Sequence, residues 1–306
     1  MPHRNEDFLA ALKSRTLLGD GAMGTQLQLA GLEPGGCGEA WNLEQPAKVL
    51  AVQKAYVDAG ADCLITNTFG GSRIMLERYA QAARTVAINE AGARIAREAF
   101  GGRPGFVLGD IGPFGGLLEP YGDFSEARVR AAFEEQASAL VAAGVDAIII
   151  ETQTALEELR LAIEAARSAG ARCVIGSVAF DVTYDASDLR TMMGVSPEDA
   201  AVFLAEHGAD VAALNCGAGV DVAWAAKVIE RYRAACRLPT MAQPNAGTPV
   251  LEKLKVVYRQ GPDEMAERLP ALLDAGANVV GACCGSTPEH IRRFRALLDE
   301  RSGRNA

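Results

Sequence analysis

A four-residue pattern built around one glycine recurs five times along the chain, and it constrains the fold more than any other feature. Each copy ends a helical pattern and precedes an apolar run: Ala59-Gly60-Ala61-Asp62, Ala143-Gly144-Val145-Asp146, Ala169-Gly170-Ala171-Arg172, His207-Gly208-Ala209-Asp210 and Ala275-Gly276-Ala277-Asn278. Glycine just past a helix takes the left-handed conformation that ends the helix at little cost. The pattern is therefore typical of the helix-to-strand connection in a repeating β–α unit.

Short apolar runs predict eight strands, at about 16–19, 62–66, 106–109, 145–150, 173–179, 210–214, 239–242 and 278–282. Runs such as Ala147-Ile148-Ile149-Ile150 are almost continuously apolar, as parallel strands covered on both faces are. Eight β–α units predict an α/β fold, a single (β/α)8 TIM-type barrel, with a doubly wound open sheet as the alternative. We expect one domain over residues 1–306, with its core at about 16–297.

Helix starts agree with this phasing. Ser196-Pro197-Glu198-Asp199 offers an N-cap, a proline at the first helical position and an acid near the dipole, and Thr287-Pro288-Glu289 opens the last helix in the same way. Two connections, at about 20–46 and 245–262, are longer than a barrel needs. Both follow the carboxyl end of a strand, so we expect them to form a lid or a docking surface for a second reactant.

Charge and composition exclude several classes of function. The formal net charge is −9 and no block of Lys or Arg stands out, which argues against a nucleic-acid partner. The first sixteen residues carry charges and no apolar leader, and the apolar runs are strand-sized, so neither a signal peptide nor a membrane span is expected. Seven cysteines in a chain of this kind indicate reduced thiols and a cytoplasmic protein.

Polar residues interrupt the apolar runs where the predicted strands end. They are Asp20, Asn67, Asp110, Glu151, Asn215, Cys216, Asn245, Cys283 and Cys284. In a parallel barrel the carboxyl ends of all strands open onto one concave surface, so these residues are expected to converge.

Three cysteines in this set predict a metal centre. Cys216 lies in Asn215-Cys216-Gly217, and Cys283 and Cys284 lie between Ala282 and Gly285. Three thiolates leave one tetrahedral position of Zn²⁺ open, which is typical of a catalytic site, and we expect a substrate, itself a candidate thiol, to take that position. The rival interpretation, a vicinal disulfide, is strained and disfavoured in a reducing compartment.

The remaining candidates have plainer interpretations. Cys63 and Cys173 are read as small buried hydrophobes, and Cys37 and Cys236 as incidental. Asp20 and Glu151 taken singly are also interpretable as helix caps, and Asn67 and Asn245 as loop ties.

Three further features carry little weight. Gly217-Ala218-Gly219 lacks the third glycine of a nucleotide-binding turn, and His207 and His290 lie in helical segments where neither is a natural fourth metal ligand. Trp41, in the first long connection, is either a packing anchor or a cover over the site.

Together the segments at the strand ends resemble the homocysteine S-methyltransferase family over about residues 16–297. The segments are Asp20-Gly21-Ala22-Met23-Gly24-Thr25, Asn67-Thr68-Phe69, Glu151-Thr152, Asn215-Cys216, Gln243-Pro244-Asn245-Ala246-Gly247 and Gly281-Ala282-Cys283-Cys284-Gly285. The resemblance implies a zinc-dependent methyltransferase in which Cys216, Cys283 and Cys284 hold Zn²⁺ and the homocysteine sulfur is the fourth ligand. The product would be methionine, which places the protein in methionine biosynthesis.

The resemblance also implies a cradle for the amino-acid part of homocysteine. Glu151 and Asp20 would face the ammonium group, and backbone amides of Gly21–Thr25 would receive the carboxylate. Asn67, Asn215 and Asn245 complete the expected substrate contacts. A related thiol remains an alternative acceptor.

The sequence is compatible with two classes of methyl donor. Phe69 is followed by Gly70-Gly71, so the aromatic pair expected of betaine enzymes is absent at that position. The segment Leu189–Gly194 is closer to the homocysteine module of methionine synthase, yet the chain has no corrinoid-binding Asp-x-His-x-x-Gly. The donor is therefore either S-methylmethionine or a methylcorrinoid, free or on a separate corrinoid protein. A non-catalytic zinc-thiolate protein, or a subunit of a multi-component methyltransferase, is the alternative function.

Overall fold

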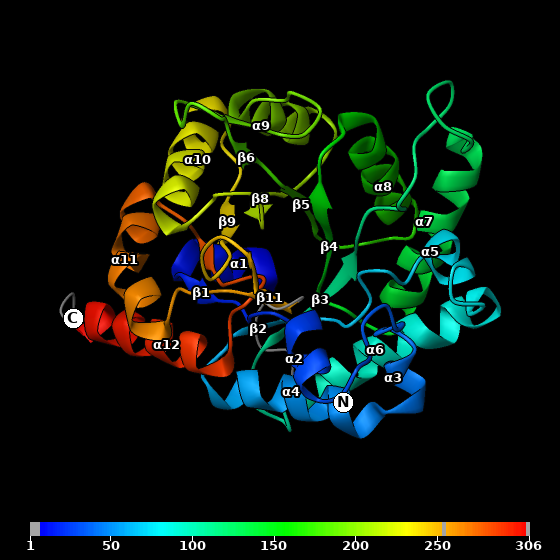
Figure 1. Cartoon of the computed structure of the whole chain (residues 1–306), viewed down its shortest axis with the longest axis horizontal. Helices are drawn as coiled ribbons and strands as arrows, with labels where there is room; N and C mark the ends of the chain where they lie inside the picture. Colours follow the sequence, from blue (N-terminus) through cyan, green and yellow to red (C-terminus); the bar gives the residue numbers. More distant parts are fainter. Residues whose placement is uncertain (1–6, 253–254, 304–306) are drawn as a thin grey trace.

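The computed structural model describes residues 7–252 and 255–303. Eight parallel strands form one sheet that curves into a nearly closed barrel (Figure 1): β1 (Leu17–Leu18), β2 (Cys63–Ile65), β3 (Phe106–Ile111), β4 (Ala147–Gln153), β5 (Val174–Val178), β8 (Val211–Asn215), β9 (Thr240–Gln243) and β12 (Val279–Val280). The strands neighbour one another in chain order from β2 to β12, and β1 pairs with β12. The (β/α)8 prediction is confirmed, and the open-sheet alternative is wrong.

A helix follows each barrel strand and covers the outside. These helices are α4 (Pro46–Asp58), α6 (Thr85–Ala99), α7 (Glu126–Ala142), α8 (Leu156–Ser168), α9 (Pro197–Glu206), α10 (Val222–Ala235), α11 (Pro262–Ala275) and α12 (Pro288–Gly303). Ser196 caps α9 through the Asp199 N–H, as predicted, and the glycines of all five repeated patterns have φ between +83° and +101°. Within residues 7–252 and 255–303, no helix is both long and apolar enough to cross a membrane.

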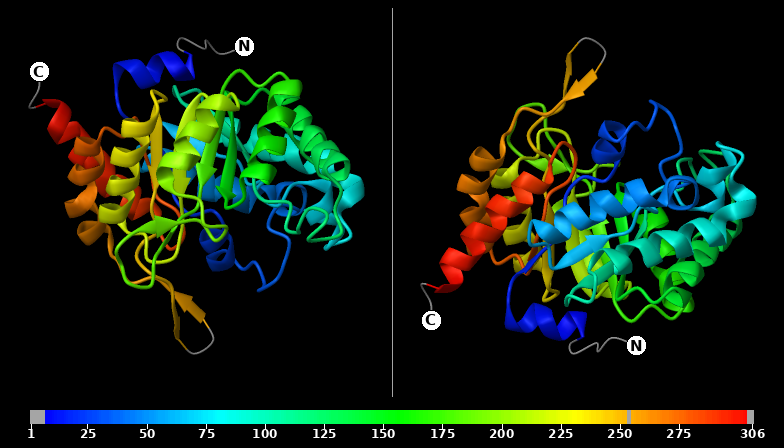
Figure 2. Two further views of the ribbon diagram at one scale, coloured as in Figure 1. Left: turned by 90° about the horizontal axis from the view of Figure 1, so that it is seen from above. Right: turned by 90° about the horizontal axis from the view of Figure 1, so that it is seen from below.

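Two apolar layers stabilise the barrel. The inner layer fills the barrel lumen with strand residues such as Leu108, Ile149 and Met241, and it includes Cys63 and Cys173, which act as the predicted small hydrophobes. The outer layer packs the strands against the helices. Helix α1 (Phe8–Ser14) lies across one end of the lumen, where Phe8 meets Phe106 edge-to-face, while β10–β11 projects from the other end (Figure 2).

The last residue of the repeated pattern connects neighbouring strands at the amino end of the barrel. Side chains of Asp62, Asp146, Asp210 and Asn278 each accept a backbone N–H from the preceding strand, at 2.7–2.9 Å, from Leu18, Val107, Val174 and Thr240. Each of these four residues also donates its own N–H back to the carbonyl of the same strand residue. Every second strand is therefore joined to its predecessor by a side chain, and β3–β4, β5–β8 and β9–β12 are joined by backbone pairing as well.

Arginines from α12, α8 and α6 reinforce three of these contacts. Arg295 and Arg167 bind Asp62 and Asp210 at 2.6 Å and also donate to the turn carbonyls of Gly60 and Gly208, and Arg97 pairs with Asp146. The recurring sequence pattern thus specifies a turn and also a side-chain bond from its last residue to the preceding strand. We call this bond the aspartate brace.

Aspartates also bridge the gap between β1 and β2, which do not pair as strands. The N–H of Asp62 donates to the Leu18 carbonyl at 2.7 Å, and Asp20 accepts the Ile65 N–H at 2.8 Å through one carboxylate oxygen. These bonds close the barrel at its one unpaired seam.

The connections at the carboxyl end hold elements that the sequence did not reveal. Residues 20–46 contain α2 (Gly24–Leu29) and α3 (Trp41–Glu44), and the connection after β2 contains α5 (Arg73–Glu77) and the 3₁₀ turn η1 (Ala82–Arg84). Residues 245–262 contain the hairpin β10 (Val250–Glu252) and β11 (Lys255–Val257), with 253–254 outside the described residues. Trp41 packs beside α4 under Lys48, which supports the packing-anchor interpretation.

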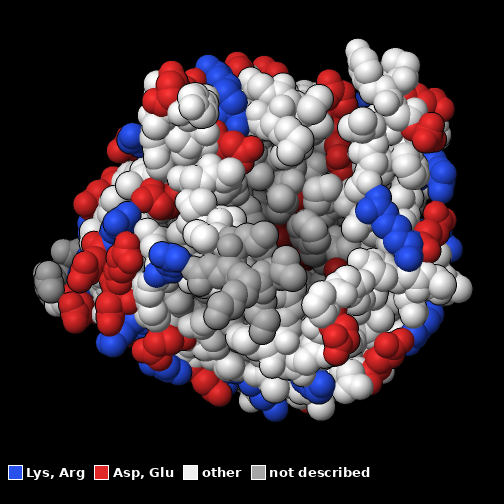
Figure 3. All heavy atoms as spheres, viewed as in Figure 1, with Lys and Arg blue, Asp and Glu red and all other residues white. Residues whose placement is uncertain are grey.

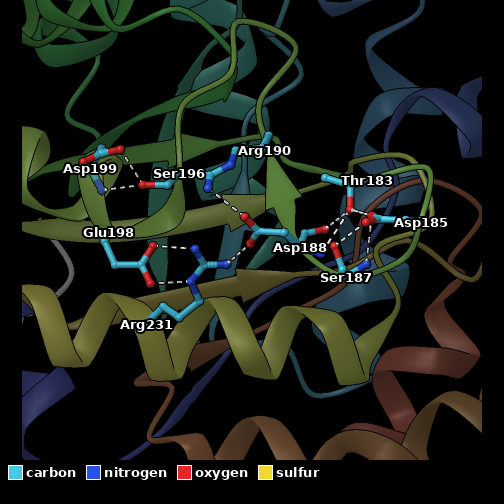
Figure 4. A network of polar contacts seen from close by, with 9 residues as sticks. All are labelled: Thr183, Asp185, Ser187, Asp188, Arg190, Ser196, Glu198, Asp199 and Arg231. Atoms are coloured by element: carbon cyan, nitrogen blue, oxygen red, sulfur yellow. Dashed lines mark hydrogen bonds and ion pairs between the residues drawn. The ribbon is translucent and has the colours of Figure 1, made fainter.

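A third long connection, after β5, was not predicted. It folds into the small hairpin β6 (Asp181–Val182) and β7 (Leu189–Arg190). Arg231 of α10 lies between Glu198 of α9 and Asp188 of this hairpin, at 2.7 Å from the latter (Figure 4). The ion pairs fix the hairpin on its two supporting helices.

We predict that Asp210→Ala lowers the free energy of unfolding by about 1–3 kcal/mol, because the buried N–H of Val174 loses its acceptor. Asp210→Asn is the matched variant, since Asn278 performs the same role in the last unit. It should retain most of the stability and lose only the Arg167 pairing. Urea denaturation of both variants measures the difference; equal losses would refute the brace.

Candidate active site

Three cysteine sulfurs meet at the carboxyl end of the barrel. The Sγ atoms of Cys216 and Cys283 lie 2.8 Å apart, those of Cys216 and Cys284 3.6 Å, and those of Cys283 and Cys284 3.9 Å. Zn–S bonds of about 2.3 Å in a tetrahedron require sulfurs about 3.8 Å apart, so two of the three separations already fit. All seven cysteines are free thiols, and the rival vicinal disulfide is not formed. The cluster has the chemistry and spacing to hold a metal ion.

Local backbone geometry turns these cysteines toward one another. Cys216 has φ +55° and Gly217 φ +88°, and a Cβ on Gly217 would lie 1.8 Å from the Phe180 carbonyl oxygen. The chain must therefore bend sharply where β8 ends, at a residue type that rarely adopts this conformation. Backbone bonds from Cys216 to Gln243 and from Cys283 to Pro244 tie both cysteine loops to β9 and the residue after it.

Asn215 holds the neighbouring strand ends in register. Its buried amide oxygen accepts from the Thr152 N–H and the Ser177 hydroxyl, and its amide nitrogen donates to Thr152 Oγ1 at 2.7 Å. The same nitrogen lies 4.0 Å from Cys283 Sγ. Asn215, predicted as a substrate contact, thus orients Thr152 and the cysteine cluster.

Three acidic side chains lie at the carboxyl ends of β1, β3 and β4, and Glu151 among them interacts electrostatically with Cys284. Asp20 and Asp110 are almost fully buried, and Glu151 on β4 shares a side-chain hydrogen bond with Asp110 on the adjacent β3. The centre of this face is hollowed, and acidic atoms show at its floor (Figure 3). Asp110 is the acid that the sequence placed at the rim without assigning it a role.

Burial raises the pKa of all three carboxyl groups. Loss of solvation raises the pKa of Glu151 to about 7, with the Cys284 charge as the next cause, and raises the pKa of Asp20 and Asp110 well above the ordinary range. Among the thiols, hydrogen bonds from Cys216 and Cys283 lower the pKa of Cys284, and the contact with Cys216 raises that of Cys283. The site without a ligand therefore disfavours the ionised form of most of these groups, and a bound cation would favour it.

Several buried acceptors around the hollow have no donor within the described residues. They are Asp20 Oδ1, Asp110 Oδ1, Gln153 Oε1, Gln243 Oε1 and Asn245 Oδ1. An unpaired buried acceptor costs free energy, so a ligand rich in N–H donors would stabilise this arrangement.

The structure separates the predicted substrate contacts into two groups. Asp20 Oδ1 and Asn245 Oδ1 are buried and have no hydrogen-bond partner among the described residues. The Asn67 amide instead donates to the Gly38 carbonyl at 2.8 Å and to Asn42 Oδ1 at 3.0 Å. Gly21 allows a close approach, because a Cβ there would lie 2.5 Å from Ser286 Oγ and 3.0 Å from Tyr56. Tyr56 on α4 and Ser286 were not predicted, because neither residue interrupts an apolar run where a strand ends.

Comparison with known proteins gives the family context. A model of the family described as homocysteine S-methyltransferase matches residues 17–298. Methionine synthase of Mycobacterium tuberculosis is 37% identical over 309 residues, which cover 95% of this chain and 25% of that protein. Methionine synthase of Mycobacterium leprae is 35% identical with the same coverage. The chain thus spans about a quarter of the length of these curated relatives.

Solved structures share the fold. The metallated form of the homocysteine methyltransferase MmuM from Escherichia coli has a TM-score of 0.77 at 22% identity, covering 94% of this chain and 99% of that one. Its oxidised form gives a TM-score of 0.76 at the same identity, over 95% of this chain and 99% of that one. At this identity the likeness concerns the barrel architecture.

We predict that Glu151→Gln stabilises the metal-free, reduced protein above neutral pH. A carboxyl group whose folded pKa is raised contributes stability that is present below about pH 4.5 and is lost as pH rises through about 7. The wild type should therefore lose on the order of 2 kcal/mol more than the variant between pH 5 and pH 8. Urea denaturation at both pH values measures this, with exposed Glu267→Gln as the control; identical pH profiles would contradict the burial argument.

Proposed function

Because the chain belongs to the homocysteine S-methyltransferase family, we propose that its barrel transfers a methyl group to the sulfur of homocysteine and forms methionine, with Zn²⁺ held by Cys216, Cys283 and Cys284. The observation that carries the proposal is the convergence of three thiol sulfurs and a carboxylate cluster at one barrel mouth. We also propose that residues 1–306 form one domain and that the protein works in the cytoplasm, where thiols stay reduced.

The donor set supports zinc as the metal. Three thiolates suit Zn²⁺ and leave one tetrahedral position for a substrate sulfur. A free thiol has a pKa of about 8.5 and is mostly protonated near neutral pH, whereas a bound zinc ion would keep the substrate sulfur in its nucleophilic thiolate form. Three cysteine thiolates and Zn²⁺ sum to a formal charge of −1. The cysteines thus provide the position and the charge that a methyl acceptor requires.

The acidic residues fit the amino-acid part of homocysteine. Glu151 and the second carboxylate oxygen of Asp20 would accept hydrogen bonds from the ammonium group, and its positive charge would favour the ionised carboxylates that burial disfavours. Asn245 Oδ1 is a further acceptor on the same side. Backbone amides of Gly21–Thr25 would receive the substrate carboxylate, although the N–H of Ala22 is already bound by Ser286.

For the donor, we favour a methylcorrinoid delivered by a separate protein or protein segment. Large apolar side chains stand exposed on the connections at the carboxyl end of the barrel, including Tyr121, Tyr184, Met192 and Met193. Tyr184 belongs to the β6–β7 hairpin, which Arg231 fixes (Figure 4), and Met192 and Met193 follow that hairpin in the chain. Exposed apolar groups on a fixed support are typical of a surface that another protein covers.

S-methylmethionine is the second candidate donor, and the charge of the site favours it. The hollow holds a third carboxyl group, Asp110, beyond the two assigned to the substrate ammonium. The ionised carboxyl group of Asp110 would balance the positive charge of a sulfonium donor.

The proposal is tested by methionine formation with zinc-loaded, reduced protein and homocysteine. S-methylmethionine, S-adenosylmethionine, betaine and methylcobalamin are offered in parallel. Turnover with a sulfonium establishes a self-sufficient enzyme, and turnover with methylcobalamin alone establishes the corrinoid route. Tight zinc binding without turnover on any donor supports the alternative, a non-catalytic zinc-thiolate protein or a subunit of a larger methyltransferase.

We predict that Cys284→Ser lowers zinc occupancy below one ion per chain and slows methyl transfer by at least about a hundredfold, since a hydroxyl is a poor zinc ligand. Cys236→Ser, at the end of α10 and outside the cluster, is the matched control and should behave as wild type. Metal analysis and methionine assays measure both properties. Full activity of Cys284→Ser would rule out the cysteine centre.

We predict that Glu151→Gln weakens homocysteine binding about 10- to 100-fold, the value of one charge-assisted hydrogen bond, while zinc occupancy stays at one. Titration calorimetry of the zinc-loaded protein measures the affinity, and metal analysis supplies the control. Unchanged affinity would remove Glu151 from the substrate site.

A further inference from the structure

Ser286 joins the two loops that the proposed reaction uses. Its side chain is fully buried, and its hydroxyl accepts the Ala22 N–H at 3.0 Å while donating to the Cys283 carbonyl at 2.7 Å. The first bond reaches the loop that starts at Asp20, and the second reaches the loop that holds Cys283 and Cys284. A hydroxyl is needed because the bridge requires a donor and an acceptor on one atom.

Neighbouring contacts show that the two loops are fitted to each other at this point. Gly21 has no room for a side chain, because a Cβ would lie 2.5 Å from Ser286 Oγ. The main-chain oxygen of Ser286 accepts from Gln26 Nε2 at 3.3 Å, and the Gly285 N–H donates to Thr25 Oγ1 at 3.4 Å. From the other side, the Tyr56 hydroxyl donates to the Ala22 carbonyl at 2.8 Å.

The two halves of the bridge differ in what supports them. The Cys283 carbonyl also accepts the backbone N–H of Ser286 at 3.2 Å, so it keeps a partner when the hydroxyl is removed. The buried N–H of Ala22 has the hydroxyl as its recorded partner and would be left unsatisfied. Loss of the hydroxyl should therefore displace the Asp20–Thr25 loop and leave the cysteine loop in place.

We propose that Ser286 is a positioning residue for substrate, which holds the Asp20–Thr25 loop at the correct distance from the metal-binding cysteines. It determines affinity for the charged, amino-acid part of the thiol substrate and not for its sulfur. The inference rests on the proposed function for the identity of that substrate. It concerns a residue that neither binds the metal nor touches the thiol.

The test compares two thiols on the zinc-loaded protein by titration calorimetry. Homocysteine carries both charged groups, and 1-propanethiol has a similar chain and thiol without them. Ser286→Ala should weaken homocysteine binding about tenfold, leave propanethiol binding within about twofold, and keep zinc occupancy at one. Ser196→Ala, which removes a buried helix-capping hydroxyl across the barrel, is the control for a general loss of stability.

Three results would overturn the inference. Equal weakening of both thiols, or loss of zinc, would place the effect of Ser286 in the cysteine loop. Unchanged binding of both thiols would show that Ser286 does not affect the substrate site. If Ser286→Ala does not fold, Tyr56→Phe removes the other bond to Ala22 with the ring retained, and it should show the same selective loss. Wild-type protein that holds zinc but does not bind homocysteine would instead refute the proposed function.

Discussion

Asp20 connects the closure of the barrel to its proposed chemistry. One carboxylate oxygen accepts the Ile65 N–H and helps bridge β1 and β2, which are not paired as strands. The other oxygen is buried and has no hydrogen-bond partner among the described residues. A carboxyl group in this position is held rigidly by the fold, and it keeps one oxygen available for a ligand. The Asp62 bonds at the same seam share the structural task, so the free oxygen of Asp20 is not needed for closure.

Several features at the carboxyl end of the barrel raise the free energy of the folded state, and the rest of the molecule offsets this cost. Three buried carboxyl groups have raised pKa values, five acceptors around the hollow have no recorded donor, and Cys216 and Thr152 adopt positive φ. The apolar lumen and the aspartate braces lie toward the opposite end and stabilise the fold there. This division is expected of a barrel, in which one end carries function and the other stability. The proposed metal and the ammonium group of the proposed substrate would both offset the unfavourable contributions at the carboxyl end.

Much of the fold could be predicted because its signals are local. A glycine after each helix, a Ser-Pro helix start and a run of four to six apolar residues each depend on neighbouring atoms, and the structure confirms them at Gly60, Ser196 and Ile148–Ile150. The cysteine cluster was predictable for a different reason: once the strands are parallel, their ends must meet. The hairpins β6–β7 and β10–β11 were missed because strands of two or three residues leave no readable periodicity. The aspartate of the repeated pattern was seen, but its bonds to the preceding strand were not deducible without the register.

The sequence by itself determined the order of the eight β–α units, the residues at their rim and the thiol chemistry of the centre, because these follow from short-range conformational preference and residue type. Only the tertiary structure decided which rim residues have atoms left for a ligand. Asn67 and Asn215 donate hydrogen bonds within the protein, whereas Asp20, Asp110 and Asn245 each keep one oxygen without a partner in the part of the chain that the structure describes. It also revealed Ser286 as the joint between two loops more than 260 positions apart in the chain. Hydrogen bonds between distant loops depend on positions fixed to within about an ångström, and such positions arise only when the barrel closes.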